Sequence, residues 1–167
     1  MRQPARLSLL AALLFTYAVV GLGQNTNGGY VAPKAPADKP VRANSDDEVA
    51  RLEKAIKPYL EQAKQTYSEA KKRFLAGLPP KHGFFLTTRL HDKEGHFEQT
   101  FIAVTEVKDG IVKGRIANEI TTVAGYKQGD EYSFPESEVL DWTITRPDGT
   151  EEGNFIGKFL DEYQKKP

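Results

Sequence analysis

The stretch that decides the fold is residues 83–116, GFFLTTRLHDKEGHFEQTFIAVTEVKDGIVKGRI. In its first part, Phe84, Leu86 and Leu90 alternate with residues that would point to the opposite side. A period of two is that of a β-strand, because successive side chains point to opposite faces of a sheet. Asp109-Gly110 then separates two β-rich runs, which is a signal for a tight hairpin. The stretch therefore predicts antiparallel strands that follow one another along the chain.

Towards the C-terminus, turn residues divide the chain further, to give about five short strands in all. The predicted strands are Gly83–His91, Phe97–Val107, Ile111–Asn118, Glu131–Phe134 and Val139–Thr145, and Ile120–Ala124 is a candidate for an additional one. A single helical turn is predicted at Pro135–Glu138. Such a small antiparallel meander either stays open or curls into an SH3-like barrel.

Amphipathic helices are predicted on both sides of the strands. Ser45 has the character of an N-cap, and apolar residues follow it at spacings of three and four as far as Phe74. Because proline cannot donate to the helical ladder, Pro58 predicts a kink or a break within this helix. A last helix is predicted over residues 154–165, capped by Asn154, with its apolar side docked on the domain. The chain is therefore predicted to form an α+β domain with a helix at each end.

The first 23 residues differ from the rest of the chain. Arg2 and Arg6 precede an uncharged, apolar run over residues 7–23 that contains small residues near its end. This order is typical of a secretory signal peptide, with cleavage predicted after Gly23. The alternative is an uncleaved N-terminal membrane anchor, since the run is close to the shortest that spans a bilayer.

The remainder of the chain divides into two parts. Residues 24–44 hold three prolines among Gly, Asn, Ala and Lys, and they are predicted to form a disordered linker. Residues 45–167 are predicted to form a single α+β domain. With the signal removed, the protein is predicted to be periplasmic or secreted, without stable insertion into a membrane.

The composition argues against several classes of function. Lys and Arg together number 23, as do Asp and Glu, so the formal net charge is zero. A nucleic-acid binder is therefore not predicted, because phosphate neutralisation needs an excess of positive charge. The chain has no cysteine, which excludes disulfides, thiolate metal sites and a thiol nucleophile. No cofactor is predicted.

The three histidines, His82, His91 and His96, lie within 15 residues of one another. His91 and His96 flank a short turn that contains Asp92 and Glu94. Two histidines and a carboxylate are the minimum for a zinc site. The spacing matches no established motif, however, and polar residues are usual in turns. No metal site is predicted, and His91 and His96 are the only candidates for one.

Polar residues near the ends of the predicted strands are the candidates for a binding site. They are Asn118, Glu119, Tyr126 and Asp141. Loops and strand ends on a rigid scaffold are where binding groups gather. Structural roles in turns are an alternative for Asn118 and Asp141. A second alternative is a hydrolase, in which Glu119 and Asp141 act as a carboxylate pair with a histidine.

Several short motifs are similar to those of one bacterial family. They are Asn118-Glu119, the Gly129-Asp130 turn, Val139-Leu140-Asp141-Trp142 and Asp148-Gly149, which follow a helix rich in Ala, Tyr and Phe. On these residues, the chain resembles the family known as domain of unknown function 2314 over residues 63–155. The resemblance implies a small bacterial domain, secreted or cytoplasmic, with no established activity and no catalytic residue to carry over.

The sequence therefore predicts an exported bacterial domain that acts as a binding or interaction module and not as an enzyme. Its partner would be a protein or a small ligand. A hydrolase that uses Glu119 and Asp141, and a periplasmic inhibitor or immunity-type protein, are the alternatives.

Overall fold

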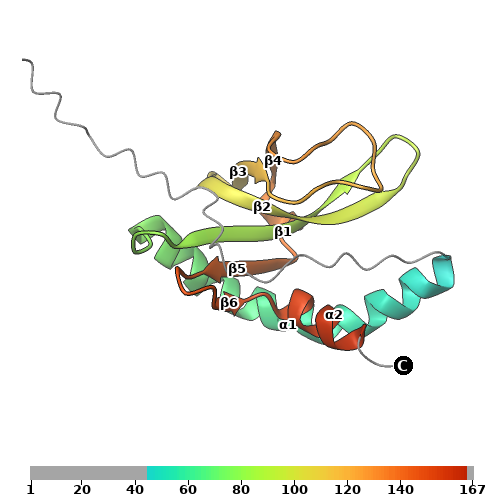
Figure 1. Ribbon diagram of the computed structural model, residues 1–167, viewed down its shortest axis with the longest axis horizontal. Coiled ribbons are helices and arrows are strands. Elements are labelled where there is room, and N and C mark those ends of the chain that lie inside the picture. Colours follow the sequence, from blue (N-terminus) through green and yellow to red (C-terminus); the bar gives the residue numbers. More distant parts are fainter. Residues whose placement is uncertain (1–44, 165–167) are drawn as a thin grey trace, which may run out of the picture.

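The computed structural model describes residues 45–164, which form two helices, six strands and one short 3-10 helix (Figure 1). The elements are, in chain order, α1 (Asp46–Ala76), β1 (Gly83–His91), β2 (Phe97–Lys108), β3 (Ile111–Ile116), β4 (Glu131–Pro135), η1 (Glu136–Glu138), β5 (Asp141–Thr145), β6 (Glu151–Gly153) and α2 (Phe155–Tyr163). This order confirms the predicted α+β class. The predicted signal peptide at 1–23 and the predicted linker at 24–44 lie outside the described residues.

All six strands belong to one antiparallel sheet with the order β4-β3-β2-β1-β5-β6. The first four strands form the predicted meander, and β5 returns to pair with the free side of β1. Because β4 and β6 are the two outer strands, the sheet is open and does not close into a barrel. The sequence prediction missed β6. The candidate strand at Ile120–Ala124 is wrong, since those residues lie in the connection between β3 and β4.

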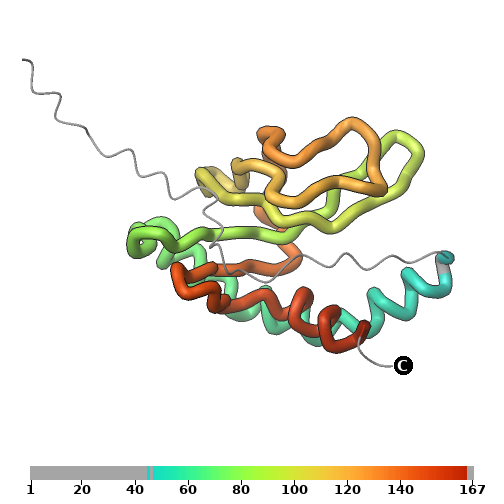
Figure 2. The backbone as a smooth tube through the Cα atoms, viewed as in Figure 1, coloured from blue at the N-terminus to red at the C-terminus, as the bar shows by residue number. Residues whose placement is uncertain are grey.

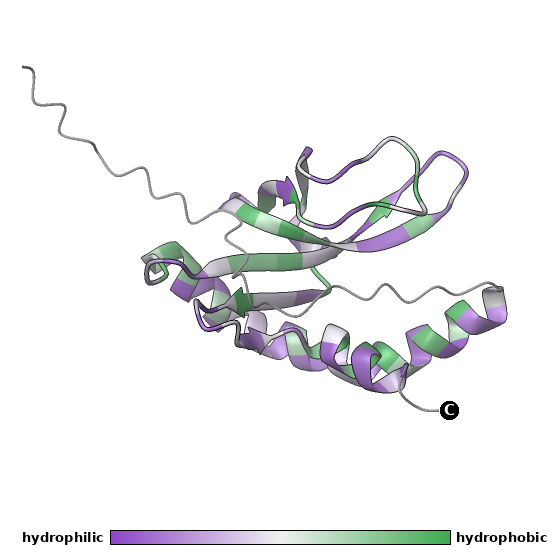
Figure 3. Ribbon diagram, in the orientation of Figure 1, coloured by the Kyte–Doolittle hydropathy of each residue, from purple (hydrophilic) through white to green (hydrophobic). Residues whose placement is uncertain are grey.

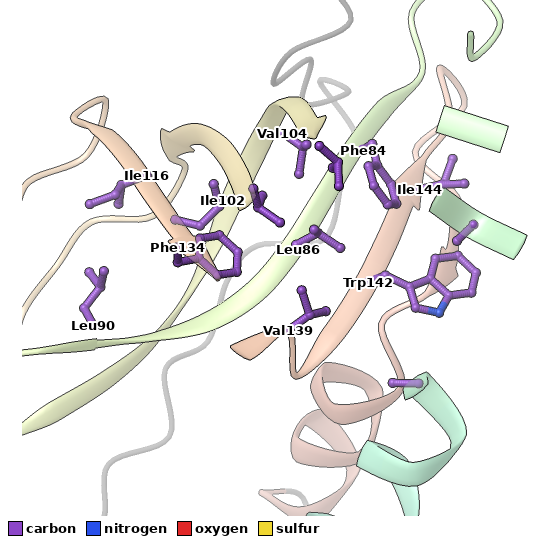
Figure 4. Packing of buried hydrophobic residues seen from close by; sticks show 14 of the residues in the cluster. Phe84, Leu86, Leu90, Ile102, Val104, Ile116, Phe134, Val139, Trp142 and Ile144 are labelled. Carbon is purple, nitrogen blue, oxygen red and sulfur yellow. The ribbon is translucent and has the colours of Figure 1, made fainter. Parts of the chain in front are cut away.

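The two faces of the sheet differ in what packs on them. On the first face, Phe84 lies opposite Ile144, and Leu86 lies opposite both Ile102 and Trp142. These side chains form the centre of the hydrophobic core in Figure 4. We refer to the opposite side of β2, β1 and β5 as the second face, on which Phe85 lies between Ala103, Thr143 and their neighbours.

Helix α1 covers the first face of the sheet. The ring of Phe74 stacks on that of Phe84 with centroids 4.9 Å apart. The indole nitrogen of Trp142 donates a hydrogen bond of 3.0 Å to the Thr66 hydroxyl of α1, and Trp142 is only 4% exposed. Figure 3 shows the resulting division, with hydrophobic residues along β1 and β2 and hydrophilic ones at the turn between them.

Helix α1 begins and ends as the sequence predicts. The Ser45 hydroxyl accepts a hydrogen bond of 3.3 Å from the Glu48 N–H, and Gly77 ends the helix with a positive φ of 93°. The helix continues through Pro58 without a break. Figure 2 shows a bend between its N-terminal part and the rest, which is the kink expected where a proline removes one helical hydrogen bond.

Helix α2 packs across α1 and the start of β5. Phe159 stacks on Tyr59 of α1 with ring centroids 4.5 Å apart, and Phe155 lies edge-on to Trp142. The predicted docking of this helix is therefore confirmed, although Tyr163 remains 43% exposed. The predicted cap is wrong, because Asn154 has a left-handed backbone and its side chain makes no capping hydrogen bond. Neither helix in residues 45–164 has the length and apolar character that crossing a membrane requires.

Candidate functional site

The connection between β3 and β4, residues 117–130, is the longest described segment without a helix or strand. Its two ends meet, because the Ile116 N–H donates to the Asp130 carbonyl at 3.0 Å and the Gly129 N–H donates to the Ile116 carbonyl at 2.8 Å. A compact surface loop whose ends are close together is an Ω-loop, a type that is frequently functional. We refer to residues 117–130 as the Ω-loop.

The carboxylate of Glu98 holds the middle of the Ω-loop. It accepts hydrogen bonds from three consecutive backbone N–H groups, those of Thr121 at 3.0 Å, Thr122 at 2.6 Å and Val123 at 3.3 Å. Hydrogen bonds to a charged acceptor are stronger than those between neutral groups. Val123 is 5% exposed and joins the hydrophobic core, so the loop is also fixed by an apolar contact.

Asn118 fixes the first residues of the Ω-loop to β2. Its Oδ1 accepts a hydrogen bond of 2.7 Å from the Phe101 N–H and one of 3.1 Å from the Thr100 hydroxyl. The side-chain oxygen of Asn118 thus accepts a β2 hydrogen bond that a backbone carbonyl of β3 would accept if that strand continued. Asn118 was predicted as a binding residue, and in this structure its oxygen holds the backbone.

Tyr126 connects the Ω-loop to two strands. Its hydroxyl donates to the His91 carbonyl at 3.2 Å, and its ring lies edge-on to that of Tyr132, with centroids 5.9 Å apart. Burial is the main cause of a raised pKa at the neighbouring Tyr132, so the Tyr132 hydroxyl stays neutral at physiological pH. Tyr126 therefore brings the loop beside the turn between β1 and β2, which contains the predicted metal candidates.

That turn, residues 92–96, is built around Asp92. One carboxylate oxygen accepts from the backbone N–H groups of His96 at 2.9 Å and Glu94 at 3.0 Å, and the other lies 2.9 Å from the His96 Nδ1. Burial of the carboxyl opposes ionisation, but the hydrogen bonds from His96 outweigh it and lower the pKa of Asp92. The ring of His91 packs on Phe97 instead. Nowhere in residues 45–164 do three His, Cys, Asp or Glu side chains meet in an arrangement that could hold a metal.

Asp141 lies elsewhere, at the start of β5, and is 1% exposed. One of its oxygens accepts from the Trp142 N–H at 2.8 Å and the other from the Ile156 N–H at 2.7 Å. The carboxylate therefore caps α2, the role predicted for Asn154, because it satisfies an N–H in the first turn of that helix. Burial raises the pKa of Asp141 to about 6, and the two backbone hydrogen bonds only partly offset that effect.

The strand register keeps Asp141 away from the Ω-loop. Asp141 pairs with Thr87, Thr87 pairs with Phe101, and the Ala117 N–H donates to the Phe101 carbonyl. These residues occupy four adjacent positions across the sheet, so three strand spacings, about 14 Å, separate Asp141 from the beginning of the loop. The structure thus places Asn118, Glu119 and Tyr126 in one loop, which Tyr126 connects to the His91–His96 turn, and leaves Asp141 out. It does not assemble Glu119 and Asp141 into a carboxylate pair.

Comparison with known proteins places the chain in a family. A family described as "Uncharacterized protein conserved in bacteria (DUF2314)" matches residues 50–165. The chain belongs to that family. The DUF2314 match includes α1 from residue 50 onwards, the whole sheet, the Ω-loop and α2. No curated protein sequence and no solved structure gives a significant match to the chain.

The sequence interpretation of this DUF2314 chain missed Glu98, and it named Asp92 only as a carboxylate near the two candidate metal ligands and not as the residue that organises the turn. A signal for Glu98 was present. Glu98, Thr100 and Ile102 alternate along β2 and therefore point to the same face of the sheet. A charged residue thus continues a series of side chains that point inward. Such a charge needs a partner to be buried. No comparable signal identified Asp92, because an acidic residue in a turn is common.

Proposed function

We propose that this DUF2314 protein is exported and that its mature domain binds a partner through the Ω-loop and the adjacent turn at residues 92–96. We refer to these two segments together as the loop surface. The partner is a protein or a small ligand, and an inhibitor or immunity-type role would be one form of this activity. Export is supported by the positive start, the uncharged apolar run and the small residues that end at Gly23.

The observation that supports binding most directly is the set of contacts that hold the Ω-loop. Glu98 engages three of its backbone N–H groups, Asn118 fixes its first residues, and Tyr126 ties it to His91. A loop ordered in this way gives up conformational entropy, which a simple connection between two adjacent strands does not require. Binding residues commonly lie on irregular loops that a rigid scaffold holds in place.

The chemistry of the loop surface fits a polar partner. Glu119, Thr122, Lys127 and Gln128 are exposed on the Ω-loop, and His96 is exposed on the turn. Both signs of charge and several hydrogen-bonding groups are therefore available. The side chains of Glu119, Thr122 and Lys127 make none of the supporting hydrogen bonds described above, so they can be changed without removing those supports. Gln128 and His96 differ, because the Gln128 amide donates to the Ala117 carbonyl at 2.7 Å and the His96 Nδ1 lies 2.9 Å from Asp92.

The test exchanges charges on the loop surface at constant net charge. The double variant Glu119→Lys/Lys127→Glu is compared with Glu61→Lys/Lys64→Glu, which reverses an exposed pair on α1. Partners of the natural protein are first identified by crosslinking in intact cells and mass spectrometry, and binding is then measured with purified components. We expect the loop variant to bind at least about tenfold more weakly, a loss of about 1.4 kcal/mol.

The control variant should bind as the natural protein does, and both variants should melt at nearly the natural temperature. Equal binding by the loop variant and the natural protein would show that the partner uses another surface. Export is tested separately by N-terminal sequencing of the protein found outside the cytoplasm. We expect it to begin at Gln24, and a protein that begins at Met1 and needs detergent for extraction would contradict cleavage.

A further inference from the structure

The two outer strands of the sheet differ in whether their outward backbone groups have partners. On β6, the Asn154 N–H donates to the Trp142 carbonyl of β5. Because strand residues alternate, the backbone groups of Glu151 and Gly153 point away from β5. The Lys158 side chain of α2 donates to both outward carbonyls, at 2.7 Å to Gly153 and at 3.5 Å to Glu151. Helix α2 thus closes this edge, and a lysine there is one way in which proteins keep an outer strand from pairing with other chains.

Strand β4 has the same kind of outward groups, and they are open. The Ile116 N–H of β3 donates to the Asp130 carbonyl. By alternation, the N–H and C=O groups of Glu131 and Ser133 therefore point away from β3. No hydrogen bond within residues 45–164 involves these backbone groups, and both residues are exposed. Figure 1 shows β4 and β6 at opposite ends of the sheet, so Lys158 closes only one of them.

The free groups of β4 match those of a second β4 strand. If two copies pair antiparallel about a two-fold axis at Tyr132, Glu131 of each copy lies opposite Ser133 of the other. Residues paired in this way exchange both N–H···O bonds, so the outward groups of both residues gain partners. Pro135 has no N–H with which to extend this ladder, so the pairing ends close to the end of the strand.

The aromatic side chains of β4 suit the same register. Tyr132 would face its counterpart across the axis, in the type of pair that brings side chains closest. Its ring is held edge-on to Tyr126 and stacked on Phe134, with centroids 5.9 and 5.8 Å apart, respectively. Tyr132 is only partly buried, so it has surface left to cover. Aromatic pairs across neighbouring strands stabilise a sheet.

The charges of β4 also permit pairing with an identical strand. Like charges directly opposite each other destabilise a strand pair, and in this register Glu131 faces the uncharged Ser133. The two Glu131 side chains would be diagonal neighbours. Each of them already forms an ion pair of 2.8 Å with Arg115 of its own chain, which offsets their mutual repulsion.

We propose that two copies of the protein bind each other through β4, with Tyr132 on the two-fold axis, to form one continuous antiparallel sheet. Because Lys158 closes the β6 edge, the association stops at a dimer. A strand pair of this length is small beside the about 1,200–2,000 Å² of a stable interface, so the dimer dissociates on dilution. This proposal does not depend on the loop surface or its partner.

The test changes the charge opposite Glu131. Ser133→Glu would place two carboxylates directly opposite each other, whereas Ser133→Lys would place an ammonium group opposite Glu131. Ser68→Glu and Ser68→Lys are the matched controls, because Ser68 is an exposed serine on α1. Dimerisation of the natural protein and the four variants is measured by sedimentation equilibrium between about 10 μM and about 1 mM, a range suited to weak association.

We expect Ser133→Glu to weaken dimerisation at least about threefold and Ser133→Lys to strengthen it at least about threefold, because each dimer contains two such cross-strand pairs. The two Ser68 variants should dimerise as the natural protein does.

Hydrogen exchange of the natural protein tests the proposal without any substitution. The amides of Glu131 and Ser133 should exchange at least about threefold more slowly at about 1 mM than at about 10 μM, because pairing removes them from water. The outward amides of Glu151 and Gly153 on β6 should exchange at rates that do not depend on protein concentration.

A protein that sediments as a monomer up to about 1 mM, with exchange independent of concentration, would overturn the proposal. A dimer that all four variants form equally well would also overturn it, since the copies would then meet on another surface. Protection of the Glu131 and Ser133 amides that appears only when another protein is added would assign the β4 edge to that protein and not to a second copy.

Discussion

At the scale of single residues, two of the polar residues predicted for a binding site, Asp141 and Asn118, have structural duties. Asp141 caps α2 from the start of β5, and Asn118 supports β2 after β3 has ended. Both residues belong to the motifs by which the sequence resembled its family. The fold therefore accounts for Asn118 and Asp141 in these motifs, and the exposed Glu119 next to Asn118 is the better candidate for contact with a partner.

The raised pKa of Asp141 predicts how stability depends on pH. Because its pKa is about 6 in the folded state and close to 3.8 in the unfolded chain, the folded state binds the proton more tightly. The contribution of Asp141 to stability is therefore fully present below pH 3.8 and is lost as the pH rises through 6. Relative to Asp141→Asn, the natural protein should gain about 2.4 kcal/mol in its free energy of unfolding between pH 7 and pH 4.

Urea denaturation of both proteins across this pH range measures the difference. Asp148→Asn is the control, since hydrogen bonds from Thr150 lower the pKa of Asp148 and its contribution is lost only at lower pH. A difference between natural protein and Asp141→Asn that stays constant with pH would show that Asp141 titrates normally in the folded state.

Asn118 provides a second prediction at this scale. Asn118→Ala leaves the Phe101 N–H and the buried Thr100 hydroxyl without their acceptor, which should lower the free energy of unfolding by about 1–3 kcal/mol. Asn118→Asp keeps an acceptor oxygen at that position and should lower the free energy of unfolding by less. Chemical denaturation of the two variants distinguishes loss of the acceptor from loss of the side chain. Equal destabilisation by both would mean that the oxygen is not the important group.

At the scale of elements, the Ω-loop depends on a residue outside it. Glu98→Gln removes the negative charge and one acceptor oxygen from the three N–H groups of residues 121–123. Exchange of these amide hydrogens with solvent should become at least about tenfold faster, because the loop opens more easily. Amides in β1 should change little. Hydrogen exchange followed by nuclear magnetic resonance measures both, and Glu94→Gln on the nearby turn is the matched control.

The side chains of α2 should contribute unequally to the stability that its docking provides. Ile156 is 3% exposed, Phe159 is partly buried against Tyr59, and Tyr163 is 43% exposed. Alanine substitutions should therefore destabilise in the order Ile156, Phe159 and Tyr163. Ile156→Ala should lower the free energy of unfolding by about 2–4 kcal/mol and Phe159→Ala by about 1–3 kcal/mol, whereas Tyr163→Ala should have little effect. Thermal and urea unfolding test the order, and a larger effect of Tyr163→Ala than of Ile156→Ala would contradict this packing.

At the scale of the whole molecule, the sequence predicted elements whose patterns are local. The alternation at Phe84, Leu86 and Leu90 identified β1, and Asp109-Gly110 identified the turn after β2, where both residues have positive φ. Strand β6 was missed because three residues are too few to show a period. The path of the Ω-loop depends on Glu98, more than 20 residues away, and the cap of α2 depends on Asp141. Contacts between distant residues leave no periodic signal.

The candidate site was predicted in part for the same reason. Asn118, Glu119 and Tyr126 were found because they follow a recognisable strand, and their segment does form the loop surface. Asp141 was grouped with them because it also lies near a strand end, but the sequence does not show that β5 pairs with β1. The strand order then decides which strand ends become neighbours.

That strand order has a consequence for how an exported chain acquires its structure. A protein that crosses a membrane unfolded emerges from its N-terminus, so α1 and the meander β1–β4 would be outside first. Strand β5, which covers the remaining edge of β1, and α2, which rests on Asp141, would arrive last. Until then the central strand would have one unpaired edge, which is prone to pair with other chains. If the protein is exported unfolded, as we propose, the sheet would be completed only when β5 and α2 emerge, and a chaperone would be needed most before that point.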